Sequence, residues 1–151
     1  MIGIDNIDRA LLRELQKNGS AKASDLGKAV GLSQSAAWRR IKRLEDAKVI
    51  NGKRIVLDAV KLGFSVTVFL GVKLAAKGRV SLEDFERAVS AVPEVQLVQH
   101  VLGMYDYRLK VVATDLGDFE RVLRRRIMTL PGVGDVEANV LLSEEKRNFV
   151  I

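Results

Sequence analysis

The sequence predicts an α+β fold in two domains, a helical one followed by one that mixes strands and helices. Up to about residue 57, apolar residues recur every three or four positions, which is the period of amphipathic helices. From residue 64 onward, β-branched and aromatic runs alternate with helical patterns, as in a layer of helices on a sheet. With 151 residues and a hydrophobic fraction of 48%, the chain is long enough to bury a real core.

The excess of positive over negative charge lies entirely in the first domain. Residues 1–57 hold 12 Lys/Arg against 6 Asp/Glu, whereas residues 58–151 hold 13 of each, and the net charge is +6. A basic module joined to a neutral one indicates a polyanion-binding domain with a partner domain. The chain has no cysteine, no apolar run of about 18 residues and no signal peptide at its start. We therefore expect a cytoplasmic protein without disulfides or a membrane span.

Three short helices are predicted in the first domain. The first covers residues 9–17 after an acidic start, and the second covers residues 23–30. Gly31 ends the second helix, since an αL residue is least strained without a Cβ. Ser33 is a good N-cap for the third helix, which runs to residue 45 and buries a stripe at helical spacing. A tight glycine-containing turn between the last two helices is typical of a helix-turn-helix.

A β-hairpin is predicted after the third helix. Asn51-Gly52 separates two β-prone runs within residues 48–57, and this dipeptide suits a turn in which both central residues need φ > 0. A hairpin that follows a helix-turn-helix is a wing. The first domain, residues 1–57, is therefore predicted to be a winged helix-turn-helix.

The third helix has a small polar start and a basic remainder, which suits a DNA major groove. Gln34, Ser35 and Arg39 lie on its first turns and are the base-reading candidates, because Gln pairs with adenine and Arg with guanine. Each good pair contributes about 1–3 kcal/mol of discrimination. The full set of candidate DNA-binding residues is Ser33, Gln34, Ser35, Trp38, Arg39, Arg40, Lys42, Arg43, Lys53 and Arg54.

Several of these residues have a second interpretation. Arg40 is either a phosphate contact or a structural ion-pair partner. Trp38 either packs, part-buried, against the helices, the interpretation that we favour, or forms a wall against the sugar-phosphate backbone. The charges of Lys53 and Arg54 either contact phosphates or protect an edge strand from pairing with another chain.

The second domain, residues 64–151, follows a linker at residues 58–63 and has the order βαββαβ. This order predicts a ferredoxin-like α/β sandwich. Ser81 is the expected N-cap of its first helix. The predicted elements are a strand at 64–74, a helix at 81–92, strands at 95–102 and 107–113, a helix at 116–129 and a strand at 136–142.

The turn at residues 103–106 is the candidate small-molecule site of this domain. Gly103 lets the backbone approach a ligand and present N–H groups to a carboxylate, and Asp106 can accept from an α-amino group. The alternative is a hairpin turn chosen for φ > 0 with an Asx-type bond. His100 has no metal-ligand spacing around it and is read as structural, and residues 124–126 are read as a solvated or interface face.

The chain lacks the patterns of an enzyme, a metal site or a cofactor site. No Ser/His/Asp arrangement, paired-carboxylate pattern, P-loop or GxGxxG is present. We therefore expect no catalytic residue, no cofactor and no metal.

Across nearly its whole length the chain resembles the Lrp/AsnC (feast/famine) family of bacterial and archaeal transcription regulators. The motifs that carry the resemblance are Ile7-Asp8, Leu11-Leu12-x-x-Leu15-Gln16-x-Asn18-Gly19, Val30-Gly31-Leu32-Ser33, Arg40-Ile41-Lys42-Arg43-Leu44-Glu45, Val49-Ile50-Asn51-Gly52, Gly103-x-Tyr105-Asp106-Tyr107 and Leu130-Pro131-Gly132-Val133. The resemblance implies an N-terminal DNA-binding domain. It also implies a C-terminal domain that dimerises, assembles further (often to octamers) and binds amino acids or related small molecules.

Two positions depart from the family pattern. Lys22 stands where the family has Ser or Thr capping the second helix, so Ser24 is expected to cap it one turn later. Met104 stands where the family commonly has Asp or Glu in the sensing turn. With Gly103, Met104, Tyr105 and Asp106 as the implied effector-binding residues, the missing carboxylate predicts a changed effector choice or a lost response.

Together these features predict a sequence-specific transcription regulator of the cytoplasm and nucleoid. Its expected partners are double-stranded DNA, further copies of itself (a dimer, with an octamer of four dimers as the larger form) and an amino-acid effector. The first alternative is an architectural, nucleoid-type DNA binder without effector control. The second is a metabolic enzyme, or its regulatory subunit, built on the ferredoxin-like domain, which the basic first domain argues against.

Overall fold

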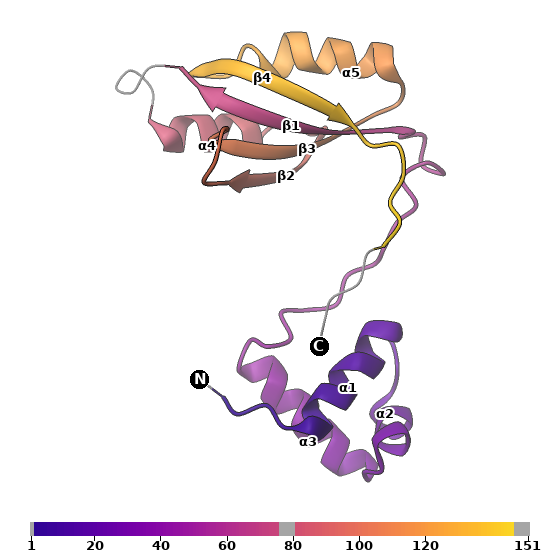
Figure 1. Cartoon of the computed structure of the whole chain (residues 1–151). Coiled ribbons are helices and arrows are strands. Elements are labelled where there is room, and N and C mark those ends of the chain that lie inside the picture. Colours follow the sequence, from indigo (N-terminus) through magenta and orange to yellow (C-terminus); the bar gives the residue numbers. More distant parts are fainter. Residues whose placement is uncertain (1, 76–80, 147–151) are drawn as a thin grey trace. The chain divides into compact units, whose positions relative to one another are not determined.

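The computed structural model describes residues 2–75 and 81–146, which form two compact units that divide between Val56 and Leu57. Figure 1 shows three helices in the first unit and a sheet with helices in the second. The α+β class is confirmed, and so is the order of the predicted elements apart from the hairpin after the third helix.

The first unit contains α1 (Asn6–Lys17), α2 (Ala23–Val30) and α3 (Gln34–Asp46). Ser33 caps α3 as predicted, since its hydroxyl accepts the N–H of Ala36 at 3.2 Å. Gly31 ends α2 in the left-handed region with φ of 73°. The core brings together one apolar residue from each helix, and the members of this cluster are Leu11, Leu26 and Ala37.

The expectation that Ser24 caps α2 is wrong. Lys22 occupies the N-cap position without a side-chain cap, and the helix begins at Ala23, so Ser24 lies inside its first turn. The backbone N–H groups of Asp25 and Leu26 are satisfied by the carbonyl of Lys22 at 3.0 Å. A hydroxyl inside the helix cannot replace a cap that precedes it.

The predicted wing is also wrong, because residues 51–58 form no strand. A two-residue type I′ turn needs φ > 0 at both central residues. Lys48 is the only residue other than glycine with positive φ in the described part of the chain, so Asn51 does not meet this requirement. Lys48 uses its left-handed conformation to end α3, where the N–H of Val49 bonds the carbonyl of Leu44 at 2.9 Å.

The second unit is a four-stranded antiparallel sheet with helices. Its strands are β1 (Val66–Leu74), β2 (Val95–His100), β3 (Tyr107–Ala113) and β4 (Val133–Val140). The strand order β2-β3-β1-β4 and the βαββαβ sequence confirm the ferredoxin-like fold. Compared with the predicted ranges, β1 begins two residues later, β2 ends two residues earlier, and β4 lies closer to the preceding helix.

Helices α4 (Leu82–Ser90) and α5 (Leu116–Val122) cover one face of this sheet. Phe85 of α4 and Phe119 of α5 share one buried cluster with alternate residues of β1, such as Leu70. The other face is open and carries the intervening residues, among them Phe69, Lys73, Arg108 and Lys110.

The helix predicted at residues 116–129 is not α-helical throughout. Residues Leu123–Ile127 form a π turn, in which the N–H of Met128 bonds the carbonyl of Leu123 at 2.9 Å. The extra residue of this turn keeps Ile127 fully buried five positions after Val122, while Arg124, Arg125 and Arg126 all stay exposed. No helix within the described residues is both long and apolar enough to cross a membrane.

Candidate nucleic-acid interface and effector turn

The start of α3 forms an exposed, shallow surface. Ser33, Gln34, Ser35 and Trp38 line it together, and the hydroxyls of Ser33 and Ser35 lie 3.2 Å apart. Trp38 is 57% exposed and lines a neighbouring pocket together with Leu26 and Ile41, so it is part-buried, which is compatible with the favoured interpretation that it packs against the helices. Its ring is available to make van der Waals contact with a sugar-phosphate backbone. Four of the predicted DNA-binding residues thus lie on one surface.

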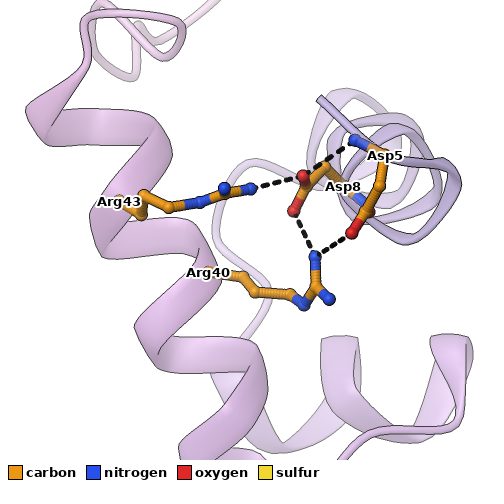
Figure 2. Close-up of polar contacts among 4 residues, drawn as sticks. All are labelled: Asp5, Asp8, Arg40 and Arg43. Atoms are coloured by element: carbon orange, nitrogen blue, oxygen red, sulfur yellow. Dashed lines mark hydrogen bonds and ion pairs between the residues drawn. The ribbon is translucent and has the colours of Figure 1, made fainter. Parts of the chain in front are cut away.

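The cations of α3 fall into two groups. Arg39 is exposed and makes no ion pair with any residue that the structure describes. Lys42 pairs with Asp46 at 2.8 Å, one turn later on the same helix. Arg40 and Arg43 point instead toward the start of α1 (Figure 2).

Asp5, Asp8, Arg40 and Arg43 form one connected network, which we call the Asp8 cluster (Figure 2). Nη1 of Arg40 donates to Asp5 at 2.6 Å and to Asp8 at 2.8 Å, and Nη2 of Arg43 donates to the other oxygen of Asp8. Asp5 and Asp8 also form a capping box at the start of α1, in which each carboxylate accepts the other's backbone N–H. The cluster therefore ties α3 to the start of α1, and Arg40 is the structural ion-pair partner of the second interpretation.

The carboxylate of Asp8 is fully buried. Burial by itself raises the pKa of a carboxyl group, but the backbone N–H of Asp5 and the guanidinium groups of Arg40 and Arg43 outweigh it, so the pKa of Asp8 is lowered. The pKa of Asp5 is lowered by the backbone N–H of Asp8 and by Arg40. Both groups are charged at neutral pH.

The sequence interpretation missed this cluster, because it assigned the acidic residues only to the helix dipole. A usable signal was present in the spacing. Asp5 and Asp8 are three residues apart at a helix start, and Arg40 and Arg43 are three residues apart on α3, so each pair shares a face. Lys53 and Arg54 lie exposed on the extended segment after α3 and not on a wing.

In the second unit, the turn at residues 103–106 is tied to the sheet by two side chains. The hydroxyl of Tyr105 donates to Glu137 of β4, and its ring lies against Gly71 of β1, where an added Cβ would come within 2.5 Å of a ring atom. Asp106 accepts the backbone N–H of Leu74 at 2.9 Å and pairs with Lys73 at 3.1 Å.

Two expectations for this turn are wrong. Gly103 is not among the residues with positive φ, so the turn does not need its special freedom. The bond that Asp106 makes is not of the local Asx type, because its partners belong to β1. The N–H of Leu74 and Lys73 lower the pKa of Asp106, so this carboxylate is charged but already engaged.

A pocket beside this turn contains three of the four predicted effector residues, and Met104 among them is 78% exposed. Arg108 is the one cation among the residues that line it. The full lining is Phe69, Leu70, Gly71, Val101, Gly103, Met104, Tyr105, Tyr107, Arg108 and Asn139. A small apolar cavity with one cation can hold a small carboxylic acid that has an apolar side chain.

The remaining residues singled out in this unit have structural surroundings. The ring of His100 stacks on Tyr107 with 4.8 Å between centroids, and the Tyr107 hydroxyl donates to Glu86 at 2.6 Å. Burial and Glu86 raise the pKa of Tyr107 to about 12. Arg124 pairs with Glu120. Within residues 2–75 and 81–146, no group of three His, Asp or Glu side chains is placed to hold a metal.

Comparison with known proteins covers both units. The family model described as the AsnC-type helix-turn-helix domain matches residues 4–45, and that of the Lrp/AsnC ligand binding domain matches residues 67–151. The chain is 36% identical to the leucine-responsive regulatory protein of Haemophilus influenzae, over 98% of this chain and 90% of that one. It is 33% identical to the transcriptional regulator AzlB of Bacillus subtilis, over 99% and 96% of the two chains.

The solved structures that superpose on this chain are also transcription regulators. A transcriptional regulator of Neisseria meningitidis in complex with L-Met superposes with a TM-score of 0.90 at 30% identity, covering 96% of this chain and 94% of that one. An AsnC family transcriptional regulator of Agrobacterium tumefaciens gives a TM-score of 0.87 at 33% identity, with 97% and 95% covered. These relatives are transcription regulators and not enzymes. The chain belongs to the Lrp/AsnC family of DNA-binding transcription regulators.

Proposed function

We propose that the exposed start of α3 reads the DNA sequence, with Gln34, Ser35 and Arg39 facing base edges in the major groove. The observation that carries this proposal is the division of the α3 side chains. Gln34 and Arg39 have no partner among the described residues, whereas Arg40, Lys42 and Arg43 are engaged within the protein. A side chain that reads bases must be free to donate to them in the complex.

The other members of the predicted set supply the sequence-independent contacts. Ser33 caps α3, and Trp38 packs against the backbone of the DNA. Lys53 and Arg54 bind phosphates from the exposed segment after α3, and Lys42, Arg40 and Arg43 add to the positive field of the same domain. Phosphate contacts of this kind fix register and carry no sequence information directly. A dimer would present two α3 helices to half-sites about one helical turn, or a multiple of it, apart.

The test is binding to the duplex upstream of the chain's own gene and to a random duplex, at several salt concentrations. Gln34→Ala and Arg39→Ala should each reduce the preference for the upstream duplex, by about 1–3 kcal/mol per lost base pair contact. Arg87→Ala is the matched control, because this exposed arginine lies on α4 and, among the described residues, pairs with Asp84 and not with the first unit. If both α3 variants keep the wild-type preference for the upstream duplex over the random one, the assignment of the reading face is wrong. A wild-type chain that never prefers the upstream duplex would favour the architectural alternative.

The pocket beside the turn at residues 103–106 is the proposed site for an amino acid or a related small molecule. A similar regulator from Neisseria meningitidis is described in complex with L-Met, which supports an apolar amino acid here. Arg108 would pair with the carboxylate, and Met104 would contact the side chain of the effector. Asp106 is held by Lys73 and Leu74, so its part would be to position the turn.

A panel of amino acids added before thermal unfolding tests this site. A ligand that binds only the folded protein stabilises it by about 2.7 kcal/mol at one hundred times its Kd. Arg108→Leu should abolish the response, while Lys110→Leu, on the same face of β3 two residues away, should keep it. If no member of the panel changes either Tm or DNA affinity, the chain does not sense amino acids.

The open face of the sheet is the proposed contact between two copies of the chain in a dimer, with an octamer of four dimers as the larger assembly. Phe69 lies in the middle of this face on a central strand, and an aromatic residue is a typical anchor of an interface core. Phe69→Glu should reduce the mass of the assembly measured by light scattering. Leu116→Glu should not, because Leu116 is an exposed residue of α5, away from the open face. The assembled regulator would act in the cytoplasm on nucleoid DNA.

A further inference from the structure

A hollow beside α3 brings three arginines together with a single carboxylate. Its lining consists of Asp5, Leu32, Ala36, Arg39, Arg40 and Arg43, and we call it the arginine hollow. Three guanidinium groups around one concavity form a natural anion site, because each presents several N–H donors in a planar fork.

The two carboxylates that meet these arginines differ in exposure. Asp8 is fully buried behind Arg40 and Arg43, whereas the side chain of Asp5 is 52% exposed and lines the hollow itself. Arg40 remains 29% exposed and Arg43 46% exposed, so both guanidinium groups can still reach an incoming anion. Asp5 is therefore the negative charge that an anion in the hollow encounters.

We propose that the arginine hollow binds a backbone phosphate of DNA and that Asp5 competes with this phosphate for Arg40. The inference rests on the proposed function of α3 as the DNA-reading helix. Arg43 supplies the N–H groups that do not bond Asp8, and the phosphate replaces the Asp5 end of the bond that Arg40 now shares between Asp5 and Asp8. Arg39 lines the hollow and adds to its positive charge, but its donors are left for the bases. Asp8 keeps its hold on both arginines, so α3 stays attached to α1.

This competition lowers the affinity for every sequence equally. A phosphate contact carries no base information, so a stronger one raises binding to random DNA as much as to the correct site. Asp5 thus limits the sequence-independent part of the binding and leaves discrimination to the base contacts. The number of phosphates neutralised is measurable, because log Kd changes with log salt by about 0.9 for each one on duplex DNA.

The experiment compares the full-length chain with Asp5→Asn, Asp5→Ser and the control Glu14→Gln. Asparagine and serine are good N-caps, so both variants keep the cap that Asp5 provides for the N–H of Asp8, and only the charge is removed. Glu14 pairs with Lys17 on α1, so Glu14→Gln changes the net charge of the domain equally without touching the hollow. Circular dichroism melts verify that each chain is folded.

Binding is measured with a random duplex and with the duplex upstream of the chain's own gene across a salt series. We expect both Asp5 variants to bind the random duplex about fivefold more tightly at low salt, the effect of removing one unit charge about 4 Å away in water. Because Asp5 keeps Arg40 in part of the wild-type complexes, the magnitude of the salt slope should rise by up to about 0.9 when Asp5 loses its charge. The slope of Glu14→Gln should match the wild type.

Equal slopes in the wild type and both Asp5 variants would overturn the competition, and so would an equal rise in Glu14→Gln. This outcome leaves the proposed function standing as long as the wild type binds DNA. A wild-type chain that binds no duplex at low salt would instead remove the proposed function, and the inference with it.

Discussion

Asp8 in the first domain and Asp106 in the second each accept a backbone N–H and pair with basic side chains, but in different surroundings. Asp8 of the first domain is fully buried between Arg40 and Arg43. Asp106 of the second is 31% exposed, and its one ion-pair partner within the described residues is Lys73. A buried charge without its partner costs several kcal/mol, whereas an exposed pair contributes about 0–1 kcal/mol. The same pattern of contacts thus serves stability in one domain and the placement of a turn in the other.

The size of the cores makes this difference more important. Among the described residues, the buried apolar cluster of the first domain has three members, whereas that of the second has thirteen. The first domain has less apolar burial with which to oppose the loss of chain entropy. The Asp8 cluster, which connects α1 to α3, therefore carries a larger share of its stability.

Removing both cations from Asp8 should have the largest effect. In Arg40→Met/Arg43→Met the aliphatic stems remain, but the buried carboxylate keeps only the N–H of Asp5. The free energy of unfolding should fall by about 3–5 kcal/mol. Urea unfolding followed by the fluorescence of Trp38, the single tryptophan, reports on this domain. Lys42→Met, which breaks only the exposed pair with Asp46, should change it by less than about 1 kcal/mol.

The same double variant should invert the pH dependence of the Asp8 contribution. In the wild type the pKa of Asp8 is lowered, so its stabilisation is present above the unfolded pKa of about 3.9 and is lost as the pH falls through the folded pKa. Without the arginines, burial raises the pKa, and protonation then relieves the cost of the buried charge. The stability gap between the two chains should narrow from pH 7 toward pH 4. A constant gap would mean that Asp8 is not buried as a charge.

A smaller loss is expected from Gly27→Ala in α2. A Cβ at this position would lie 2.7 Å from the backbone oxygen of Leu32, in the turn that leads into α3. Because that oxygen belongs to the backbone, the turn must move, and overpacking of this kind costs about 1–3 kcal/mol. The midpoint of urea unfolding should fall, and DNA affinity should fall with it. Gly19→Ala is the control, since its nearest contact lies at 3.8 Å.

The smallest effect is expected from Lys73→Met in the second domain. Asp106 is part exposed and keeps the N–H of Leu74, so the free energy of unfolding should change by about 0–1 kcal/mol. Far-ultraviolet circular dichroism during urea unfolding measures it. A loss as large as that of Arg40→Met/Arg43→Met would mean that both aspartates stabilise the fold alike.

The sequence predicted the elements better than the contacts between them. The bounds of α2 and β3 and the cap at Ser33 follow from local periodicity and hydrogen bonding, which are properties of short stretches. The hairpin at Asn51-Gly52 failed, because a turn motif forms a hairpin only when its flanking strands also pair. The π turn at residues 123–127 could not be predicted from the sequence, since one extra residue in a helix leaves the apolar pattern almost unchanged.

The candidate site likewise has parts that could be predicted from the sequence and parts that could not. The exposed start of α3 could be predicted, because a helix-turn-helix fixes which face of its third helix is presented. The partners of Arg40 and Arg43 lie more than 30 residues away on α1, and no pattern within α3 points to them. The engagement of Asp106 with Lys73 likewise depends on how β1 and β3 pair.

The contact between Gly71 and Tyr105 couples two positions that are 34 residues apart in the chain. Any side chain at position 71 would occupy the space of the Tyr105 ring, so the turn at residues 103–106 keeps its place only while β1 has a glycine there. In a library that varies both positions, replacements of Gly71 should survive only beside a smaller residue at 105. Variation in the pocket beside this turn therefore has to proceed by paired changes at positions 71 and 105.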